Sequence, residues 1–397
     1  MKMYKQLSEL GDIVTGKTPS TANNELWGGT TPFITPTDIE GYDTYYQEIT
    51  ERTVSAYGAS RQQKTLLPPN SVCVTCIGST IGKPCITKSV SITNQQINSI
   101  IPNKENDYRY IYYLIRESLP YFQLIGGGSG SGTPIISKNK FARLKFPIEP
   151  NLKKQRKIAS ILSAYDSLIE NNAKRIRLLE QMAENLYKEW FAYSKISKLS
   201  TEVRLADILS YSRGLSYSSE EIDCEDGNDL INLKNIQSFG GFRLDGTKKY
   251  NGKYKKEQVV KEGDLIMGVT DMTQDRRTVG SVALIPDVYR LSIISADLIK
   301  LESNINTVYL YAMFRWGNVS KYISQFANGA NVLHLKPQVL KNIKVTLPPK
   351  PLIAKYVSIV KPMFDTINKL NTANDSLTKQ RDALLPRLMS GELEVKA

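Results

Sequence analysis

Residues 158–190 read IASILSAYDSLIENNAKRIRLLEQMAENLYKEW, and their spacing of apolar residues decides the fold. Apolar side chains recur at alternating steps of four and three, which is typical of a long helix that packs along a second helix. Residues 353–388 repeat these steps with a polar middle. The sequence therefore predicts two long, paired helices. Their expected seam positions are Ile158, Leu162, Tyr165, Ile169, Asn172, Ile176, Leu179, Ala183, Leu186 and Trp190, and Ile353, Val357, Val360, Phe364, Ile367, Asn371, Asn374, Thr378, Arg381, Leu385 and Leu388.

The two halves of the chain share one plan when the second is laid on the first at a displacement of about 199 residues. Each half places short β-type runs and Gly, Pro and Asn turns before its long helix. The duplication predicts two domains of similar fold. The matched segments are 7–10 with 205–208, 33–39 with 230–236, 71–75 with 264–268, Gly130 with Gly329, 141–144 with 340–343, Pro150 with Pro349, and Asp166 with Asp365.

The predicted fold class is α+β, with two duplicated β-rich domains separated by an antiparallel two-helix coiled coil. The antiparallel direction follows if the termini of each domain lie close together, and it gives the chain a pseudo-two-fold plan. A helix of about 38 residues would be roughly 57 Å long, or ~17 base pairs of B-DNA. The expected boundaries are 1–150 for the first domain, 151–193 for the first helix, 194–350 for the second domain, and 351–397 for the second helix and the C-terminal tail.

The composition favours a nucleic-acid partner. The chain has 397 residues, a formal net charge of +13 and a pI near 9.3, and Lys and Arg supply most of the affinity for phosphates. A basic protein can also be basic only for solubility. Because His334 is the only histidine, a His-based catalytic relay and a His-rich metal site are both disfavoured. The sequence lacks a run of about 20 apolar residues, an apolar leader and a disulfide framework, so we expect a cytoplasmic protein away from membranes.

A phosphate-binding pattern, G-x-x-x-x-G-K-T, occurs at residues 11–18. A P-loop requires a buried strand before this pattern and a helix that starts at its lysine. Residues 19–24 follow here without apolar periodicity. The context favours a structural or DNA-contacting loop, and nucleotide binding remains the weaker alternative.

Three further patterns carry less specific chemistry. The Gly-rich stretch 126–133 is expected to be a flexible loop, either close to phosphates or serving only as a linker. Cys73, Cys76 and Cys85 have metal-like spacing but alternate as in a strand, so they are expected to be buried structural residues. A nuclease-like pattern from Asp287 to Lys300 has its acid and lysine one residue too far apart, and the N-P-P-aromatic signature of base methylation is absent.

Basic clusters recur in corresponding parts of both halves, at 61–64, 138–145, 248–256, 276–277 and 336–344. One such cluster is usually a solvated face, but the recurrence favours contacts to phosphates and base edges. We predict no catalytic and no metal-binding residue. The candidate DNA-binding residues are Lys17, Thr18, Thr37, Arg61, Lys64, Ser79, Lys83, Gln95, Ser129, Lys138, Lys140, Arg213, Lys234, Lys248, Lys249, Arg276, Arg277, Asn331, His334 and Lys336.

Four motifs have a distinctive order along the chain: Gly16-Lys17-Thr18-Pro19 with Trp27-Gly28-Gly29, then Gly78-Ser79-Thr80-Ile81-Gly82-Lys83, then Lys153-Lys154-Gln155-Arg156-Lys157-Ile158-Ala159, and finally 384–393 near the C-terminus. With these motifs the chain resembles, along essentially its whole length, the specificity subunits of Type I restriction-modification enzymes. The second half departs from this resemblance, because 270–280 has no Gly-Lys where the first half has Gly82-Lys83, and 350–355 lacks the Gln155-Arg156 pair. Its recognition residues are correspondingly less defined.

The resemblance implies a non-catalytic subunit in which two target-recognition domains read a bipartite, asymmetric site on double-stranded DNA. It also implies two modification (methyltransferase) subunits that bind S-adenosylmethionine and clasp the helices. Restriction (motor/nuclease) subunits would add ATP- and Mg-dependent translocation and cleavage. This chain itself would hold none of these cofactors. The alternatives are a standalone P-loop NTPase or nuclease acting on DNA, and a coiled-coil scaffold that does not bind DNA.

Overall fold

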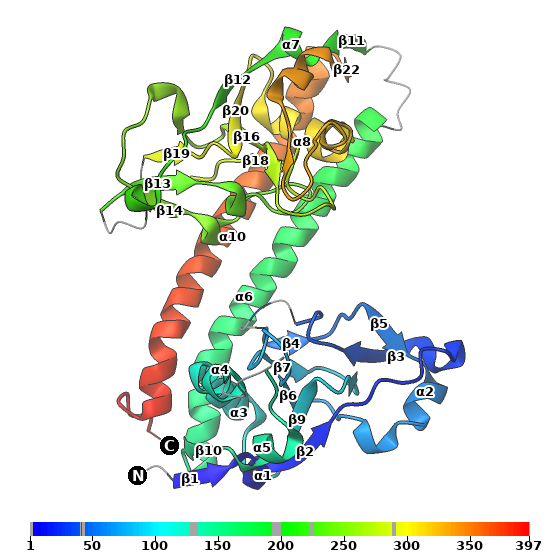
Figure 1. The fold of residues 1–397 in the computed structure, drawn as a ribbon, viewed down its shortest axis with the longest axis vertical. Coiled ribbons are helices and arrows are strands. Elements are labelled where there is room, and N and C mark those ends of the chain that lie inside the picture. The colour runs from blue at the N-terminus through cyan, green and yellow to red at the C-terminus, as the bar shows by residue number, and fades with distance from the viewer. Residues whose placement is uncertain are drawn as a thin grey trace. The chain divides into compact units, whose positions relative to one another are not determined.

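The computed structural model describes residues 3–39, 41, 44–127, 134–192, 200–222, 226–287 and 291–396 (Figure 1). The chain divides into two compact units. Unit 1 consists of Met1–Glu170 together with Ser376–Ala397, and unit 2 consists of Asn171–Asp375. Each long helix therefore contributes one part to each unit. A short linker was expected at residues 194–201; 194–199 lie outside the described residues, and Thr201 already begins β11 (Thr201–Arg204).

Unit 1 contains a five-stranded and a three-stranded sheet. The five-stranded sheet has the order β2 (Gly11–Thr15), β9 (Ile97–Pro102), β6 (Val72–Thr75), β7 (Pro84–Thr87), β4 (Tyr46–Gln47), with only the last pair parallel. The three-stranded sheet has the order β5 (Arg52–Val54), β3 (Trp27–Ile34), β8 (Ile92–Thr93). The remaining elements are β1 (Met3–Gln6), α1 (Leu7–Leu10), η1 (Asn24–Leu26), α2 (Ala56–Ser60), η2 (Gln63–Thr65), α3 (Tyr108–Glu117), α4 (Leu119–Gly127), α5 (Lys138–Arg143) and β10 (Lys145–Ile148).

Unit 2 repeats this arrangement with two four-stranded sheets. One has the order β12 (Leu209–Arg213), β20 (Leu298–Ser303), β16 (Leu265–Gly268), β18 (Val282–Leu284), and the other β14 (Lys248–Tyr250), β13 (Asn228–Ile231), β19 (Ser292–Ile294), β15 (Val259–Val260). The remaining elements are β11 (Thr201–Arg204), α7 (Leu205–Ile208), η5 (Ser219–Glu221), η6 (Leu233–Asn235), η7 (Leu244–Gly246), η8 (Lys256–Gln258), β17 (Thr270–Asp271), α8 (Thr307–Trp316), α9 (Val319–Ser324), β21 (Leu333–His334), η9 (Pro337–Asn342) and β22 (Lys344–Leu347).

The structure confirms the duplicated α+β plan. The segments matched in sequence at 7–10 and 205–208 form α1 and α7, and those at 71–75 and 264–268 contain β6 and β16. Asp107 caps α3 by accepting from two backbone amides, and Asn306 caps α8 in the same way with one. The first strand of each domain pairs with its last, β1 with β10 and β11 with β22. Both domains are thus closed by their own end strands.

The predicted long helices are α6 (Leu152–Tyr187), continued by a π-helical turn at Lys188–Ala192, and α10 (Lys350–Ser390). Every predicted seam residue is buried or half-buried. In unit 2, Asn172 Nδ2 donates to Asn374 Oδ1 at 2.9 Å and Tyr356 Oη donates to the Ala183 carbonyl at 3.2 Å. Residue numbers rise along one helix as they fall along the other, so the helices are antiparallel. The predicted coiled-coil pairing is confirmed.

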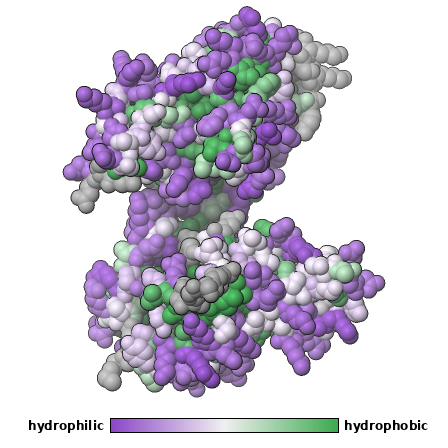
Figure 2. All heavy atoms as spheres, viewed as in Figure 1, coloured by the Kyte–Doolittle hydropathy of each residue, from purple (hydrophilic) through white to green (hydrophobic). Residues whose placement is uncertain are grey.

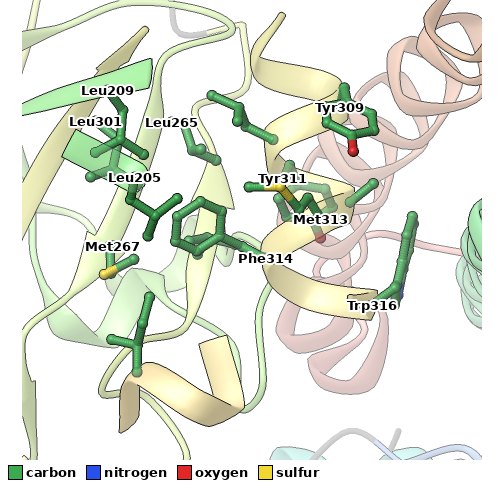
Figure 3. Packing of buried hydrophobic residues seen from close by; sticks show 14 of the residues in the cluster. Leu205, Leu209, Leu265, Met267, Leu301, Tyr309, Tyr311, Met313, Phe314 and Trp316 are labelled. Carbon is green, nitrogen blue, oxygen red and sulfur yellow. The ribbon is translucent and has the colours of Figure 1, made fainter. Parts of the chain in front are cut away.

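Each unit has a main hydrophobic core between its sheet and its helices. In unit 2, Phe314 on α8 lies toward Leu205 and Met267, whereas Tyr309 and Trp316 lie toward α10 (Figure 3). Leu385 and Leu388, near the end of α10, belong to the core of unit 1. On the face drawn in Figure 2, hydrophilic side chains cover most of the surface of each unit. Among the described helices, none combines the length and the apolar character that crossing a bilayer requires.

Candidate nucleic-acid interface

In unit 1, several loops meet where β2, β3, β6 and β8 end. Thr15 Oγ1, at the end of β2, donates to Asn98 Oδ1 at 2.6 Å. The backbone amide of Asn94 donates to the Ile34 carbonyl at 3.1 Å, and that of Cys76 donates to the Gln96 carbonyl at 2.7 Å. Side chains from distant parts of the sequence are therefore displayed at one edge of the domain.

This edge brings together Lys17, Thr18 and Gln95. Thr18 Oγ1 donates to Gln95 Oε1 at 2.8 Å, and the side chains of Lys17 and Gln95 are exposed. A Cβ atom at Gly16 would lie 2.3 Å from the Asn94 carbonyl oxygen, so only glycine allows this approach of the two loops. The result is a cation beside an amide, the pair of groups that binds phosphates and base edges.

Thr37 and Ser79 are exposed on two adjoining loops. The Asp38 carboxylate accepts from the Thr35 amide at 2.8 Å and from the Glu51 amide at 2.7 Å, which fixes the turn that carries Thr37. Lys83 Nζ donates to the Ile39 carbonyl at 2.9 Å. The Lys83 ammonium thus ties the Thr37 loop to the start of β7 in this structure, a structural contact that the sequence did not indicate.

Other candidates of unit 1 lie elsewhere. Arg61 and Lys64 are exposed beside α2, which packs against Leu26 of η1, just before β3, whereas Thr37 follows the end of β3. Lys138 and Lys140 are exposed on α5, and Lys140 Nζ donates to the Ile125 carbonyl at 2.9 Å. Ser129 and residues 128–133 of the Gly-rich stretch lie outside the described residues, whereas Gly126 and Gly127 belong to α4, so the loop prediction is wrong for these two residues. The structure therefore brings together only part of the predicted set.

The corresponding edge of unit 2 carries Arg213 and Lys234, both exposed. Arg213 is the last residue of β12. The backbone after it is fixed by two hydrogen bonds: the Gly214 amide donates to the Leu298 carbonyl at 3.1 Å, and the Leu215 amide donates to the Ile294 carbonyl at 2.9 Å. Lys234 follows the end of β13 in η6. These positions repeat the strand ends that carry Lys17 and Thr37 in unit 1.

The loop 271–279 presents Arg276 and Arg277, and the buried side chain of Asp271 organises it. The Asp271 carboxylate accepts from the amides of Thr273 at 2.8 Å and Thr278 at 2.6 Å. Burial opposes its charge, yet these hydrogen bonds hold the pKa of Asp271 below its ordinary value. This role of Asp271 was not predicted, although an Asp side chain that bonds the amide two residues on, as Asp271 bonds that of Thr273, forms an Asx turn.

A hairpin at residues 328–334 lies beside this loop. Thr270 pairs with His334, and Gln274 Nε2 donates to the Ala330 carbonyl at 3.0 Å. Asn331 and His334 are exposed on the hairpin, and Lys336 is exposed just before η9. The two loops that carry the predicted residues of this region are therefore neighbours.

Three other candidate cations, Lys248, Lys249 and Arg277, already interact with an aromatic ring or a carboxylate of unit 2. Lys249 Nζ forms an ion pair with Asp229 Oδ1 at 2.5 Å, and Lys248 Nζ lies 5.6 Å from the Tyr217 ring centroid. Both lysines are on β14, an edge strand of its sheet. Arg277 forms an ion pair with Asp275 at 2.6 Å. We expect smaller contributions to DNA affinity from these cations than from Lys17 or Arg276.

The phosphate-binding pattern has the geometry of a strand instead of a P-loop. Residues 11–15 form β2, and residues 16–23, all of them described, contain no helix. Cys73 and Cys76 belong to two different hydrophobic clusters, so they do not converge on one point. Burial raises the pKa of Cys76 to about 12, which keeps it a neutral thiol. The described residues contain no cluster of three metal-ligating side chains.

Two similar domains, each with basic and amide side chains on loops at its strand ends, define a two-domain protein of the DNA-recognition class. The chain belongs to the family of the Type I restriction modification DNA specificity domain, whose model matches residues 2–181 and 198–379.

Known relatives agree with this assignment. The chain is 27% identical to the Type I restriction enzyme MjaIX specificity subunit of Methanocaldococcus jannaschii, over 99% of this chain and 93% of the relative. It is 34% identical to the HindI specificity subunit of Haemophilus influenzae over 44% of this chain and 38% of that relative. The crystal structure of the Type I S subunit from M. genitalium has the same fold, with a TM-score of 0.63, 17% identity and coverage of 98% of this chain and 96% of the other.

Proposed function

We propose that this specificity subunit reads a bipartite, asymmetric site on double-stranded DNA, one half through each domain. The observation that carries the proposal is that matching loops hold different side chains. Lys17 is exposed where unit 2 has the buried Leu215, and the loop with Arg276 replaces the loop with Lys83. Two domains with one fold and different exposed residues are suited to two different half-sites.

In this proposal the basic side chains contact phosphates and the amides read base edges. Lys17 and Arg276 are exposed cations, and Gln95 and Asn331 are exposed amides on loops at the same strand ends. Amide side chains can bond adenine in the major groove through two hydrogen bonds, whereas phosphate contacts set position without regard to sequence.

The paired helices would bind two modification subunits, which would supply S-adenosylmethionine and the methyltransferase chemistry. Leu178 and Met182 support this role, because they are 61% and 54% exposed on α6 and lie outside its seam. Exposed apolar side chains on a helix are common contact points for partners. Restriction subunits would add the ATP- and Mg-dependent steps, and this chain would contribute no catalytic group.

The decisive experiment maps DNA methylation in a host with and without this gene. A modified site with two unlike halves is expected only when the gene is present. Replacing residues 201–347 with the matching domain of a relative should then change one half-site and leave the other unchanged. A continuous site, two identical halves, or a change in both halves would contradict the proposal. ATP hydrolysis or DNA cleavage by the isolated chain would instead support a standalone enzyme.

A further inference from the structure

Unit 2 has a groove of about 460 Å³ beside the loop 271–279. Its walls come from this loop, from Phe239, from α9 with its flanking residues, and from Arg315 of α8, which is paired with Glu180. The residues that matter for its chemistry are Phe239, Arg276, Asn318, Lys321 and Gln325. Only Arg276 was predicted to contact DNA.

The backbone holds the walls of this groove in place. The Phe239 amide donates to the Arg277 carbonyl at 2.7 Å, which joins the two loops. Gly280 has a φ of 77°, and a Cβ atom there would lie 2.9 Å from the Ser320 carbonyl oxygen, so the loop packs tightly on α9. The groove is therefore formed before any ligand binds, which reduces the entropy lost on binding.

The groove is cationic. Among the described residues, no carboxylate lies within ion-pair distance of Arg276 or Lys321, and both side chains are exposed. Asp275, the acidic residue of the lining, is paired with Arg277. Phe239 is 64% exposed, which adds an apolar surface of the size of a sugar or a base. The two cations and the two amides can bind a phosphate group, and the aromatic ring can pack against a sugar or a base, so the lining suits one nucleotide unit.

The corresponding loop of unit 1, residues 77–83, contacts apolar side chains of α4. A Cβ atom at Gly82 would lie 2.6 Å from Leu119 and 3.1 Å from Phe122, and one at Gly126 would lie 2.6 Å from Ile81. The loop 77–83 thus packs against α4, whereas residues of the loop 271–279 and of α9 line the groove in unit 2.

We infer that this groove binds one phosphate group of the DNA backbone beside the half-site of the second domain. Arg276 and Lys321 contact the phosphate, Asn318 and Gln325 donate hydrogen bonds to it, and Phe239 packs against the adjoining sugar. The inference rests on the proposed DNA-reading function and adds a contact that is independent of base sequence.

The test uses the full chain and a fluorescent duplex of random sequence, since a phosphate contact needs no specific site. Affinity is measured by anisotropy from 50 to 200 mM salt for wild type and for the double variant Arg276→Ala/Lys321→Ala. If both cations serve one phosphate, the double variant loses about 0.9 from the slope of log affinity against log salt, and its defect is about 3.5-fold larger at 50 than at 200 mM. The matched control, Lys261→Ala/Lys369→Ala, removes two exposed lysines of unit 2 outside the groove lining.

An unchanged slope, or a loss no larger than in the control, would overturn the inference. A loss of about two slope units would also overturn it, because the two cations would then serve separate phosphates. Inorganic phosphate is the second probe. If it raises the melting temperature of wild type but not of the double variant, while the DNA slope is unchanged, the groove serves a free phosphate instead. A wild-type chain that binds no duplex, alone or in the assembled enzyme, would refute the proposed function itself.

Discussion

The two units hold the same helix pair by different chemistry. In unit 1, the buried Asp166 carboxylate accepts hydrogen bonds from Arg381 and from Tyr113. Burial of Arg381 opposes its positive charge, but the neighbouring carboxylates of Asp166 and Asp382 outweigh this effect and raise the pKa of Arg381 above its ordinary value. In unit 2, aromatic rings fill the interior instead, with Tyr309 6.4 Å and Phe191 5.3 Å from the Tyr356 ring.

One connection between domain and helix is common to both units. Arg116 on α3 forms an ion pair with Asp382 of α10 at 2.7 Å, and Arg315 on α8 forms one with Glu180 of α6 at 3.0 Å. The two arginines occupy matching positions of matching helices. Each domain therefore pairs one arginine with the long helix that follows the other domain, whereas the interior beside this ion pair is ionic in unit 1 and aromatic in unit 2.

The largest expected effect comes from breaking the ionic interior of unit 1. Arg381→Met leaves the Asp166 carboxylate buried without its main partner, which should lower the free energy of unfolding by about 3–5 kcal/mol. In unit 2, Tyr356→Phe removes one hydrogen bond and should cost only about 0.5–1.5 kcal/mol. Urea unfolding of the full chain measures both.

The control for this pair is Asp166→Leu/Arg381→Leu, which removes both charges together. It should retain most of the wild-type stability, because an apolar pair avoids the desolvation of two ions. Equal losses in Arg381→Met and Tyr356→Phe would show that the ionic and aromatic interiors do not differ as we describe.

The next effect concerns the loops that carry candidate residues. Asp271 accepts charge-assisted hydrogen bonds in unit 2, whereas Thr75 Oγ1 accepts a neutral one from the Lys83 amide at 3.0 Å in unit 1. Asp271→Ala should therefore destabilise the loop 271–279 by about 1.5–3 kcal/mol, and Thr75→Val the loop 76–83 by about 0.5–1.5 kcal/mol. Amide hydrogen exchange of each loop measures the difference, and equal protection losses would contradict it.

Acid should loosen the Asp271 loop. The folded-state pKa of Asp271 lies below its ordinary value, so its stabilising contribution is complete above the unfolded pKa of about 3.9 and is lost as the pH falls through the folded value. Exchange protection of 271–279 should accordingly decline below about pH 4 in wild type. In Asp271→Asn the acid-dependent part of this decline should be missing, and an identical decline in the variant would assign the effect to another group.

A smaller effect separates Lys17 from its counterpart Leu215. Lys17→Ala should reduce the salt dependence of DNA binding by about one phosphate and affinity by a few-fold. Nucleotide affinity should be zero in wild type and variant alike. The exposed Lys104, substituted by Ala, is the control. ATP binding by the wild-type chain that Lys17→Ala abolishes would revive the NTPase hypothesis.

The smallest expected change is a shift in the gap between half-sites, if helix length sets that gap. Deleting 169–175 and 368–374 removes one heptad from each helix and keeps both seams in phase. About 10 Å of helix is lost, so the preferred gap should contract by one to ~3 base pairs while both half-sites stay the same. Selection from a library with randomised gaps, using the assembled methyltransferase, measures it. An unchanged gap with retained activity would exclude the helices as the spacer.

The fold was predictable because its signals are local or repeated. The seam spacing marks both helices, and the duplication doubles the evidence for each domain. Even the polar middle of the second seam has a structural partner, since Asn374 bonds Asn172. Such a polar pair in a helix seam favours one register over others. The seam position of Arg381 was also a signal, because a charged residue in a seam needs a buried partner.

The interface was less predictable because its contacts join residues far apart in sequence. Nothing local links Thr270 to His334, or Lys83 to the carbonyl of Ile39. Composition identified basic loops, but it could not show that Lys249 and Arg277 already have acidic partners. The individual DNA contacts therefore stay predictions, whereas the strand ends that display them are observed.

The composition of unit 1 from the first and last parts of the chain has a consequence for synthesis on the ribosome. Leu385, Leu388 and Met389 complete the core that begins with Leu7 and Leu10. Unit 2, by contrast, is contiguous over Asn171–Asp375. At 5–20 residues per second, the ribosome needs roughly 10–40 s to pass from the end of the first segment of unit 1 to the start of its last. Unit 2 can therefore finish folding first, and the nascent N-terminal domain must wait, with part of its core uncovered, for the segment that closes it.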